Sequence, residues 1–521
     1  MPEMTIQQAM DLAMTHHQTG QVKEAQAIYR QVLSAQPDHA NALHMLGVAM
    51  FQTGDSSSAL QLISRAISID GAVPDFHNSL ARILLLIGRL EESIQASRRA
   101  IELRFAFPEA LLNLAIAQFH LGEIEEAQST ARKVIELSPQ NPQAWNALGA
   151  MLREQGKSNE AIDAFQTALK FQSKFVEAAT NLAGTHRETG RLAEAIEAYR
   201  NVIVIAPDWP TGHYNLALTL LLTGDFKQGW IEHEWRCQIK EPRPVCLDFQ
   251  FPRWRGQPLD GKRLLIHCEQ GFGDTIQFVR YVSLAASRSG QIVMLCQPEL
   301  VRLVKQINGI DQVVTQGDPL PTVDFHCPLL SLPYLFNTEL QSIPQNVPYI
   351  SSDAEESLYW RRRLGNHQSK LKIGLVWKGG KFHIEDRLRS ITFKHLQPLF
   401  KLPNIQWISL QKESRAEGIL LADLVDWTDD LKDFADTAAL VDNLDLVITV
   451  DTAVAHLAGA MGKVVWMLLP FVPDWRWMLG RDDSPWYPTI QLFRQPSRGD
   501  WNTPIDQVLN SLQSFVNEFP R

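Results

Sequence analysis

Cysteine is scarce in this chain, and its arrangement matches neither a metal site nor a set of disulfides. The five copies are odd in number and include no Cys-x-x-Cys pair; they are Cys237, Cys246, Cys268, Cys296 and Cys327. This scatter predicts no zinc site and no disulfide framework. Because free thiols suit a reducing compartment, we expect a cytoplasmic protein.

Long apolar runs, a basic excess and a leader-like N-terminus are also missing. The best apolar run, 464–472, is short and contains Pro470, so no membrane-spanning helix is expected. The formal net charge of -9 argues against nucleic-acid binding, which needs a basic footprint. The first residues, Met1-Pro2-Glu3, lack the basic and apolar parts of a secretory signal. The length of 521 residues leaves room for several globular domains.

Glycine recurs every 34 residues through the first half of the chain. The seven positions are Gly20, Gly54, Gly88, Gly122, Gly156, Gly190 and Gly224. A small residue follows five positions later in each unit: Ala25, Ala59, Ser93, Ala127, Ala161, Ala195 and Gly229. A period of this length is typical of stacked helix pairs with glycine in the turn. The pattern resembles the tetratricopeptide repeat, so we expect an α-solenoid of about seven repeats over residues 1–238.

Asparagine recurs at one position in the first helix of three repeats, as Asn113, Asn181 and Asn215. A column of amides along a groove can hydrogen-bond a peptide backbone, which makes these residues candidates for an acceptor groove. Similar ladders occur in the eukaryotic O-linked N-acetylglucosamine transferases. Asn78 and Asn146 lie one residue earlier in their repeats, so the column is incomplete. Ordinary solvated helix positions remain the alternative.

The period changes after the array. A linker over 239–260 is followed by short apolar segments that alternate with helical ones, which is typical of parallel sheets with crossover helices. The predicted strands are 262–267, 291–296, 311–314, 322–325, 371–377, 405–410, 446–450 and 464–468. We therefore expect two Rossmann-like domains, 261–365 and 366–521, with a cleft between them.

The segment Val450–Ala460 carries the sharpest motif of the second domain. Asp451 and Thr452 directly follow a predicted strand and are good N-cap residues for the next helix. Such a helix start offers free N–H groups and a partial positive charge, both suited to a phosphate. His456, one turn further on, can reach the same ligand. The alternative is a capped core helix with a buried histidine.

Five further segments carry a family resemblance, namely 271–275, 374–377, 386–390, 409–412 and 468–495. In this order they resemble bacterial proteins in which tetratricopeptide repeats precede a glycosyltransferase of the lipopolysaccharide heptosyltransferase type. The resemblance implies the GT-B fold, with two Rossmann-like domains and a nucleotide-sugar bound mainly by the second. It also implies a reaction without metal or other cofactor. No Asp-x-Asp follows a strand in the manner of metal-dependent transferases.

The resemblance also implies catalytic roles. Asp274 matches the residue that takes the acceptor proton, although a helix N-cap is the alternative for it. Lys378, just past a strand, is placed to neutralise the departing diphosphate, and here the chain departs from the small residue usual in the group. His267 and Glu269 are second-choice bases.

The residues implied for donor binding are more numerous. They are Gly273, Arg387, Ser390, Lys412, Asp451, Thr452, Ala453, His456, Trp475 and Arg476. A solvated surface position is the alternative for each basic residue. The aromatic loop, which contains Trp475, Arg476, Trp477, Trp486 and Tyr487, either contacts the donor or forms an irregular core.

These patterns together predict an inverting glycosyltransferase. Its partners are a nucleotide-sugar donor and a polypeptide or glycan acceptor, with protein partners bound through the repeats. The alternative is a repeat scaffold with an inactive transferase-like half. The segment Gly229–Arg236 departs from the repeat pattern and predicts a joint to the catalytic half.

Overall fold

The computed structural model describes residues 4–240, 245–288, 290–365, 370–380, 386–412 and 424–518, apart from the side chain of Arg387. The chain divides into two compact units, Met1–His186 (unit 1) and Arg187–Arg521 (unit 2).

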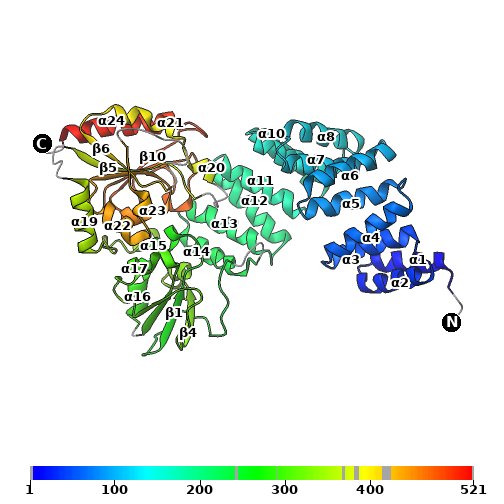
Figure 1. Ribbon diagram of the computed structural model, residues 1–521, viewed down its shortest axis with the longest axis horizontal. Helices are drawn as coiled ribbons and strands as arrows, with labels where there is room; N and C mark the ends of the chain where they lie inside the picture. The colour runs from blue at the N-terminus through cyan, green and yellow to red at the C-terminus, as the bar shows by residue number, and fades with distance from the viewer. Residues whose placement is uncertain are drawn as a thin grey trace. The chain divides into compact units, whose positions relative to one another are not determined.

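Unit 1 is a series of antiparallel helix pairs (Figure 1). The helices are α1 (Ile6–Gln18), α2 (Val22–Ala35), α3 (Ala40–Gln52), α4 (Ser56–Ile69), α5 (Pro74–Leu86), α6 (Leu90–Leu103), α7 (Pro108–His120), α8 (Ile124–Leu137), α9 (Pro142–Glu154), α10 (Ser158–Phe171) and α11 (Val176–Glu188). The predicted glycines lie in the turns between paired helices with positive φ, such as 80° at Gly20 and 92° at Gly54. Glycine enters this region without the steric cost that other residues carry, which explains the 34-residue recurrence.

Small residues permit the close packing of each helix pair. The small positions five residues after the turn, such as Ala25 and Ala59, are completely buried. A Cβ added to Gly149 would lie 2.6 Å from the Phe165 ring, and one added to Gly47 would lie 2.7 Å from Ile63. The helices of these pairs therefore approach to a distance that only glycine allows at these two sites.

Unit 2 begins with the last three helices of the array. They are α12 (Leu192–Ile205), α13 (Pro210–Leu222) and α14 (Phe226–His233). Over residues 4–240, which are all described, the array thus contains the fourteen α-helices that the repeat period predicts.

A four-stranded parallel sheet follows (Figure 1). Its strands are β1 (Arg263–His267), β2 (Gln291–Leu295), β3 (Gln312–Val314) and β4 (Phe325–Pro328), in the order β3-β2-β1-β4. The helices beside it are α15 (Phe272–Phe278), α16 (Val282–Ala286), α17 (Val301–Val304) and α18 (Leu332–Leu335). The fourth strand lies three residues later than predicted because the chain pairs with β1 from Phe325 onward.

The second sheet has six parallel strands in the order β10-β9-β8-β5-β6-β7. The strands are β5 (Leu371–Val376), β6 (Ile405–Ser409), β7 (Leu424–Asp426), β8 (Leu446–Val450), β9 (Val465–Leu469) and β10 (Ile490–Arg494). The sequence analysis did not predict β7 or β10. In chain order the first strand is central and the series reverses between β5 and β8. This is the doubly wound arrangement in which ligands bind at the point of reversal.

Helices cover both faces of the six-stranded sheet (Figure 1). One face packs on α21 (Phe393–Leu396) and α24 (Asn502–Glu518), and the other on α22 (Phe434–Val441) and α23 (Ala453–Ala460). Two further helices are α19 (Ala354–Leu364) and α20 (Asp386–Arg389).

The region around α14 packs against the α/β part of unit 2. The Trp230 indole N–H donates to the Thr338 carbonyl at 2.9 Å, and its ring meets Trp475 edge-on at 5.4 Å. Arg236 is completely buried and pairs with Glu269 at 2.6 Å. These contacts explain why the seventh repeat loses the repeat pattern, since its outer surface is buried as a core.

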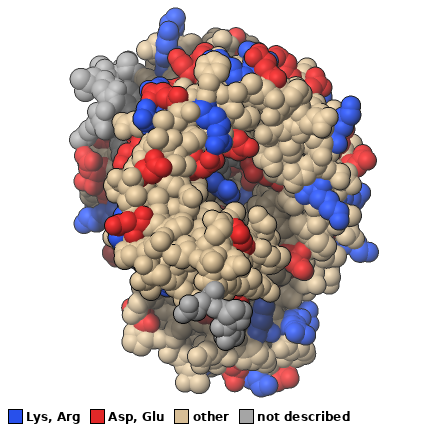
Figure 2. All heavy atoms as spheres, turned by 90° about the vertical axis from the view of Figure 1, so that its right-hand side faces the viewer, with Lys and Arg blue, Asp and Glu red and all other residues tan. Residues whose placement is uncertain are grey.

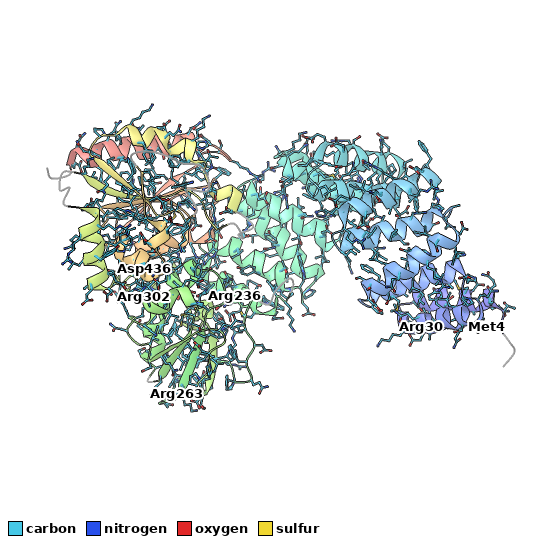
Figure 3. All side chains as sticks on the ribbon, viewed as in Figure 1. Met4, Arg30, Arg236, Arg263, Arg302 and Asp436 are labelled. Atoms are coloured by element: carbon cyan, nitrogen blue, oxygen red, sulfur yellow. A yellow bond between two sulfur atoms is a disulfide. The ribbon has the colours of Figure 1, made fainter. Side chains whose placement is uncertain are left out.

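One ion pair and one disulfide link further parts of unit 2. Arg302 on α17 lies beside Asp436 on α22, at 3.1 Å, and so joins the helices of the two sheets (Figure 3). Cys237 and Cys246 form a disulfide, so the expectation of no disulfide is wrong. The spacing of nine residues did not reveal that their Cα atoms come within 4.8 Å.

Charge is mixed on the face of the molecule that Figure 2 shows. On the face in Figure 2, basic side chains are interspersed with acidic ones among the described residues. No helix in the described ranges is long and apolar enough to cross a membrane.

Candidate functional site

A cavity of about 1170 Å³ lies within unit 2, at the carboxyl ends of strands from both sheets. The start of α15, which follows β1, supplies Gly273 and Asp274, and the segments after β5, β8 and β9 supply Lys378, Asp451 and Arg476. Helix α13 of the array supplies another part of the wall. The cavity therefore brings together residues that lie far apart in the sequence.

The loop after β1 presents an acidic helix start. Gly271 is the N-cap of α15 and Asp274 is the third helical residue, whose carboxylate accepts the Gly271 N–H at 2.8 Å. Asp274 thus makes only the N3-to-N-cap half of a capping box, because glycine has no side chain to return the bond, and it is not itself the N-cap considered from the sequence. Its carboxylate also forms an ion pair with Arg476.

The starts of α15 and α23 lie against each other. A Cβ added to Gly273 would lie 2.8 Å from Cδ2 of His456 and 3.6 Å from the Ala453 Cα. Glycine is therefore required here by close approach, and this contact brings the Asp274 loop next to the motif after β8.

His456 is a buried and neutral member of the site. Burial lowers its pKa well below the ordinary value, and the nearby Arg476 lowers it further. Its Nδ1 lies 2.9 Å from the Tyr487 hydroxyl and its Nε2 lies 3.8 Å from the Asp451 carboxylate. The ring also lines the cavity, so both alternatives considered for this histidine apply in part.

Thr452 begins α23 without capping it. Its side chain makes no capping hydrogen bond, and its hydroxyl lies 3.1 Å from that of Thr449. Ala453 follows as the first helical residue, and both residues line the cavity. The start of α23 thus borders the cavity and has no capping bond from the Thr452 side chain.

Asp451 is an acid with an unusual affinity for its proton. Burial raises the pKa of this carboxyl to about 6, and the charge of Asp474 contributes to the rise. Only 9% of the residue is exposed. Keeping a carboxylate ionised in such a place lowers the stability of the folded protein. Carboxyl groups with pKa values perturbed in this way cluster at functional sites.

The basic residues take different positions. Lys378 and Lys412 line the cavity, and the Lys378 backbone N–H donates to the Gln411 side chain at 2.9 Å. Ser390 does not line it; its hydroxyl accepts the Gly379 N–H at 3.1 Å and holds the loop after β5. The side chain of Arg387, another predicted donor contact, lies outside the described part of the structure.

The aromatic loop is mainly a core. Trp475 lines the cavity but is only 4% exposed, and it packs edge-on against Trp230 and Trp486. Trp477, Trp486 and Tyr487 are completely buried. The packed-core alternative therefore holds for these three residues, and only Trp475 stays a candidate ligand contact.

The second-choice bases lie away from the cavity. His267 is buried beside His326 at 3.2 Å, and burial lowers its pKa to about 3. Glu269 is buried in its pair with Arg236. Neither is among the residues that line the cavity, whereas Asp274 is.

The asparagine column differs from the prediction. In unit 1, Asn113 donates to Asn78 at 2.8 Å and Asn181 donates to Asn146 at 3.0 Å. The offset of one residue, which we interpreted as a break in the column, instead produces amide pairs between successive repeats. Asn215 lines the cavity of unit 2.

Tyr214 and Asp474 are among the polar cavity residues that sequence reasoning missed. Tyr214 precedes Asn215 on α13 and accepts a hydrogen bond from Gln270 at 3.3 Å. Asp474 precedes Trp475 and pairs with Arg476 at 2.8 Å. Their positions next to predicted residues were the available signal, and no spacing rule distinguishes them from surface residues.

We expect Asp451→Asn to raise the thermal stability of the protein at neutral pH. The pKa of Asp451 is higher in the folded protein than in the unfolded chain. Between pH 3.8 and about pH 6, folding is therefore accompanied by proton uptake, and the free energy of unfolding falls as the pH rises through this range. Removing the ionised group should recover about 2–3 kcal/mol at pH 7.5 and much less at pH 4.5.

Thermal unfolding at these two pH values measures the effect. The matched control is Asp483→Asn, because Arg481 lowers the pKa of Asp483, so its loss should bring no gain. An Asp451→Asn protein that melts at or below the wild-type temperature at pH 7.5 would contradict the expectation.

Family models of the tetratricopeptide repeat match the first part of the chain. The matched residues are 16–83, 80–142, 112–174 and 185–224. The helical array consists of tetratricopeptide repeats. The repeats include α13, and this array therefore supplies a wall of the cavity.

A curated relative matches more than half of the chain. Protein FlbA of Caulobacter vibrioides (strain ATCC 19089 / CIP 103742 / CB 15) is 28% identical over an alignment of 345 residues, and the match covers 58% of this chain and 54% of FlbA. The chain thus spans about half the length of this relative.

Similar solved structures include the APC/C hetero-tetramer Cut9–Hcn1, which is 19% identical in sequence and has a TM-score of 0.41. That match covers 44% of this chain and 46% of the other chain. They also include MamA, with 24% identity, 32% of this chain, 96% of that chain and a TM-score of 0.29. A third is the tetratricopeptide-repeat protein TTC0263 of Thermus thermophilus, with 22% identity, 35% of this chain, 99% of that chain and a TM-score of 0.33. These likenesses concern the fold alone.

Proposed function

We propose that unit 2 is an inverting glycosyltransferase of the GT-B type, to which the repeats bring protein partners. The observation that carries this proposal is the shared cavity. It combines Asp274, beside the four-stranded sheet, with Asp451 and His456 at the strand reversal of the six-stranded sheet. A carboxylate opposite a nucleotide-type ligand site is what sugar transfer to a hydroxyl requires.

The donor would bind on the six-stranded side, which corresponds to the predicted domain 366–521. Lys378 and Arg389 line the cavity there, beside the uncapped start of α23. Cations and a helix N-terminus stabilise the negative charge of a departing diphosphate. In this scheme Asp451 is placed to accept hydrogen bonds from donor hydroxyls.

The acceptor would approach from the opposite side, over the predicted domain 261–365. Its hydroxyl needs a base within hydrogen-bond reach, and Asp274 is the carboxylate of the β1 loop that lines the cavity. Tyr214 and Asn215 on α13 offer a hydroxyl and an amide to the remainder of the acceptor, either a polypeptide or a glycan.

The second candidate is a repeat scaffold whose α/β half is inactive. The comparisons support protein interaction more directly than sugar transfer, because the matched family models cover only the repeats. One geometric observation also favours it: one oxygen of the Asp274 carboxylate is occupied by Arg476 and the other by the Gly271 N–H, so neither is left open to an acceptor hydroxyl.

A donor screen distinguishes the two candidates. We expect the full chain to hydrolyse at least one of a panel of UDP-, GDP- and ADP-sugars slowly, because water can replace the acceptor beside Asp274. Released nucleotide is measured by a coupled assay, with the heat-denatured chain as blank. The absence of both turnover and binding for every donor would leave the scaffold as the function.

A further inference from the structure

Arg476 holds three partners at once, at the place where the two sheets meet. Its guanidinium pairs with Asp274, pairs with Asp474 at 2.8 Å and donates through Nε to the Gln277 side chain. Asp274 and Gln277 lie on α15, whereas Arg476 and Asp474 lie after β9. The residue is 8% exposed and lines the cavity.

We propose that Arg476 is a mobile counter-charge that passes from Asp274 to the leaving diphosphate as the sugar is transferred. This inference rests on the proposed transferase function. It gives Arg476 a role beyond donor binding: the residue couples deprotonation of the acceptor to departure of the leaving group.

The charge balance of the reaction explains the coupling. The acceptor O–H bond breaks and its proton goes to Asp274, while the acceptor oxygen bonds to the anomeric carbon. The bond from that carbon to the β-phosphate oxygen breaks, and its electron pair stays on the diphosphate. Asp274 thus loses one negative charge in the step in which the diphosphate gains one.

Arg476 is suited to follow this charge. Protonation of Asp274 removes one of the two carboxylates that Arg476 pairs with, so the buried guanidinium can gain free energy by engaging another anion. Asp474 keeps the side chain at the cavity through the other nitrogen, Nη1. A guanidinium can engage a second anion through its remaining N–H groups, since it carries five donors.

The neighbouring Arg481 shows how Arg476 differs from an arginine that forms only a surface ion pair. Arg481, on the same segment, forms a bidentate pair with the exposed Asp483 and does not line the cavity. Arg476 differs because it binds side chains of α15, which follows β1, as well as Asp474, which follows β9. One of these partners, Asp274, is the proposed base. The pair is therefore broken by the proton transfer itself.

Nucleotide binding tests the inference without requiring turnover. Asp274→Asn imitates the protonated base, so it should release Arg476 toward a diphosphate. We expect this variant to bind a nucleoside diphosphate roughly tenfold more tightly than the wild type. A nucleoside monophosphate lacks the leaving-group phosphate and should gain less than roughly twofold. Isothermal titration of the full chain with UDP, GDP or ADP and the matching monophosphate measures both.

Arg476→Gln shows whether the gain depends on the guanidinium. In that background Asp274→Asn should change diphosphate affinity by less than roughly threefold, so the double-mutant cycle gives a clear coupling. Asp483→Asn removes an equal charge outside the cavity and should leave both affinities unchanged. Asp274→Ser replaces Asp274→Asn if the latter does not fold.

The outcomes separate this inference from the proposed function. Equal gains for diphosphate and monophosphate, or equal gains with and without Arg476, would show simple charge repulsion and overturn the inference. Donor turnover by the wild type alongside such a result would leave the transferase proposal intact. A chain that binds no nucleotide at all would overturn both.

Discussion

Under the proposed function, replacing Asp274 by alanine should lower sugar transfer by roughly two to four orders of magnitude, the range that a general base contributes. Nucleotide affinity should be retained or increased, because the residue that Asp274 neutralises, Arg476, stays in place. The measurement is kcat for donor hydrolysis and for transfer, with the nucleotide Kd determined in parallel.

A matched variant separates the chemical role of Asp274 from its structural one. Asp353 caps α19 by accepting the N–H groups of Glu355 and Glu356, at 2.9 and 3.1 Å, and it does not line the cavity. Asp353→Ala should cost about 1 kcal/mol of stability and leave turnover unchanged. If the two variants lose turnover equally, Asp274 is only a cap; if neither loses turnover, the base lies elsewhere.

Replacing Arg236 by alanine is expected to destabilise unit 2 by about 3–5 kcal/mol, because it leaves the buried Glu269 without its partner. Arg236 is completely buried and also donates to the Ser331 hydroxyl at 2.8 Å and the His233 carbonyl at 3.1 Å. Burial already raises the pKa of Glu269, and Arg236 opposes that rise. Tryptophan fluorescence in urea reports this unit, since all tryptophans except Trp145 lie in it.

Two further variants give this expectation its controls. Arg481→Ala breaks a pair with the exposed Asp483 and should cost less than about 1 kcal/mol. Arg236→Met combined with Glu269→Leu removes both buried charges and should recover most of the loss. An Arg236→Ala protein as stable as Arg481→Ala would show that the joint between the last repeat and the α/β part does not depend on this pair.

The repeats were predictable because their signal is local and repeated. Each turn needs a glycine such as Gly20 with positive φ, and each helix pair needs a small residue such as Ala25 at the point of contact. Both requirements are met within a few residues and recur along the array. The offset of Asn78 from Asn113 was misinterpreted because a hydrogen bond between successive repeats is not visible in a single repeat.

The site was predictable in its parts and less so in its geometry. Asp451 and Thr452 follow a strand that sequence alone reveals, and the structure places them in the cavity with Asp274 and Lys378. Most of the aromatic loop proved to be core. The sequence could not show this, because a tryptophan-rich segment has the same composition whether it contacts a ligand or packs against other side chains. Ser390 proved to hold a loop.

Residue order alone was enough to predict the helical array, its period and the alternation of strands and helices after it, because each depends on neighbouring residues through backbone conformation and burial. The strand order, the disulfide and the pairing of Arg476 with Asp274, 202 residues apart, became visible only in the folded chain. The reason is physical: contacts between strand ends depend on how the sheets are ordered and closed. No local pattern of residues encodes that order directly.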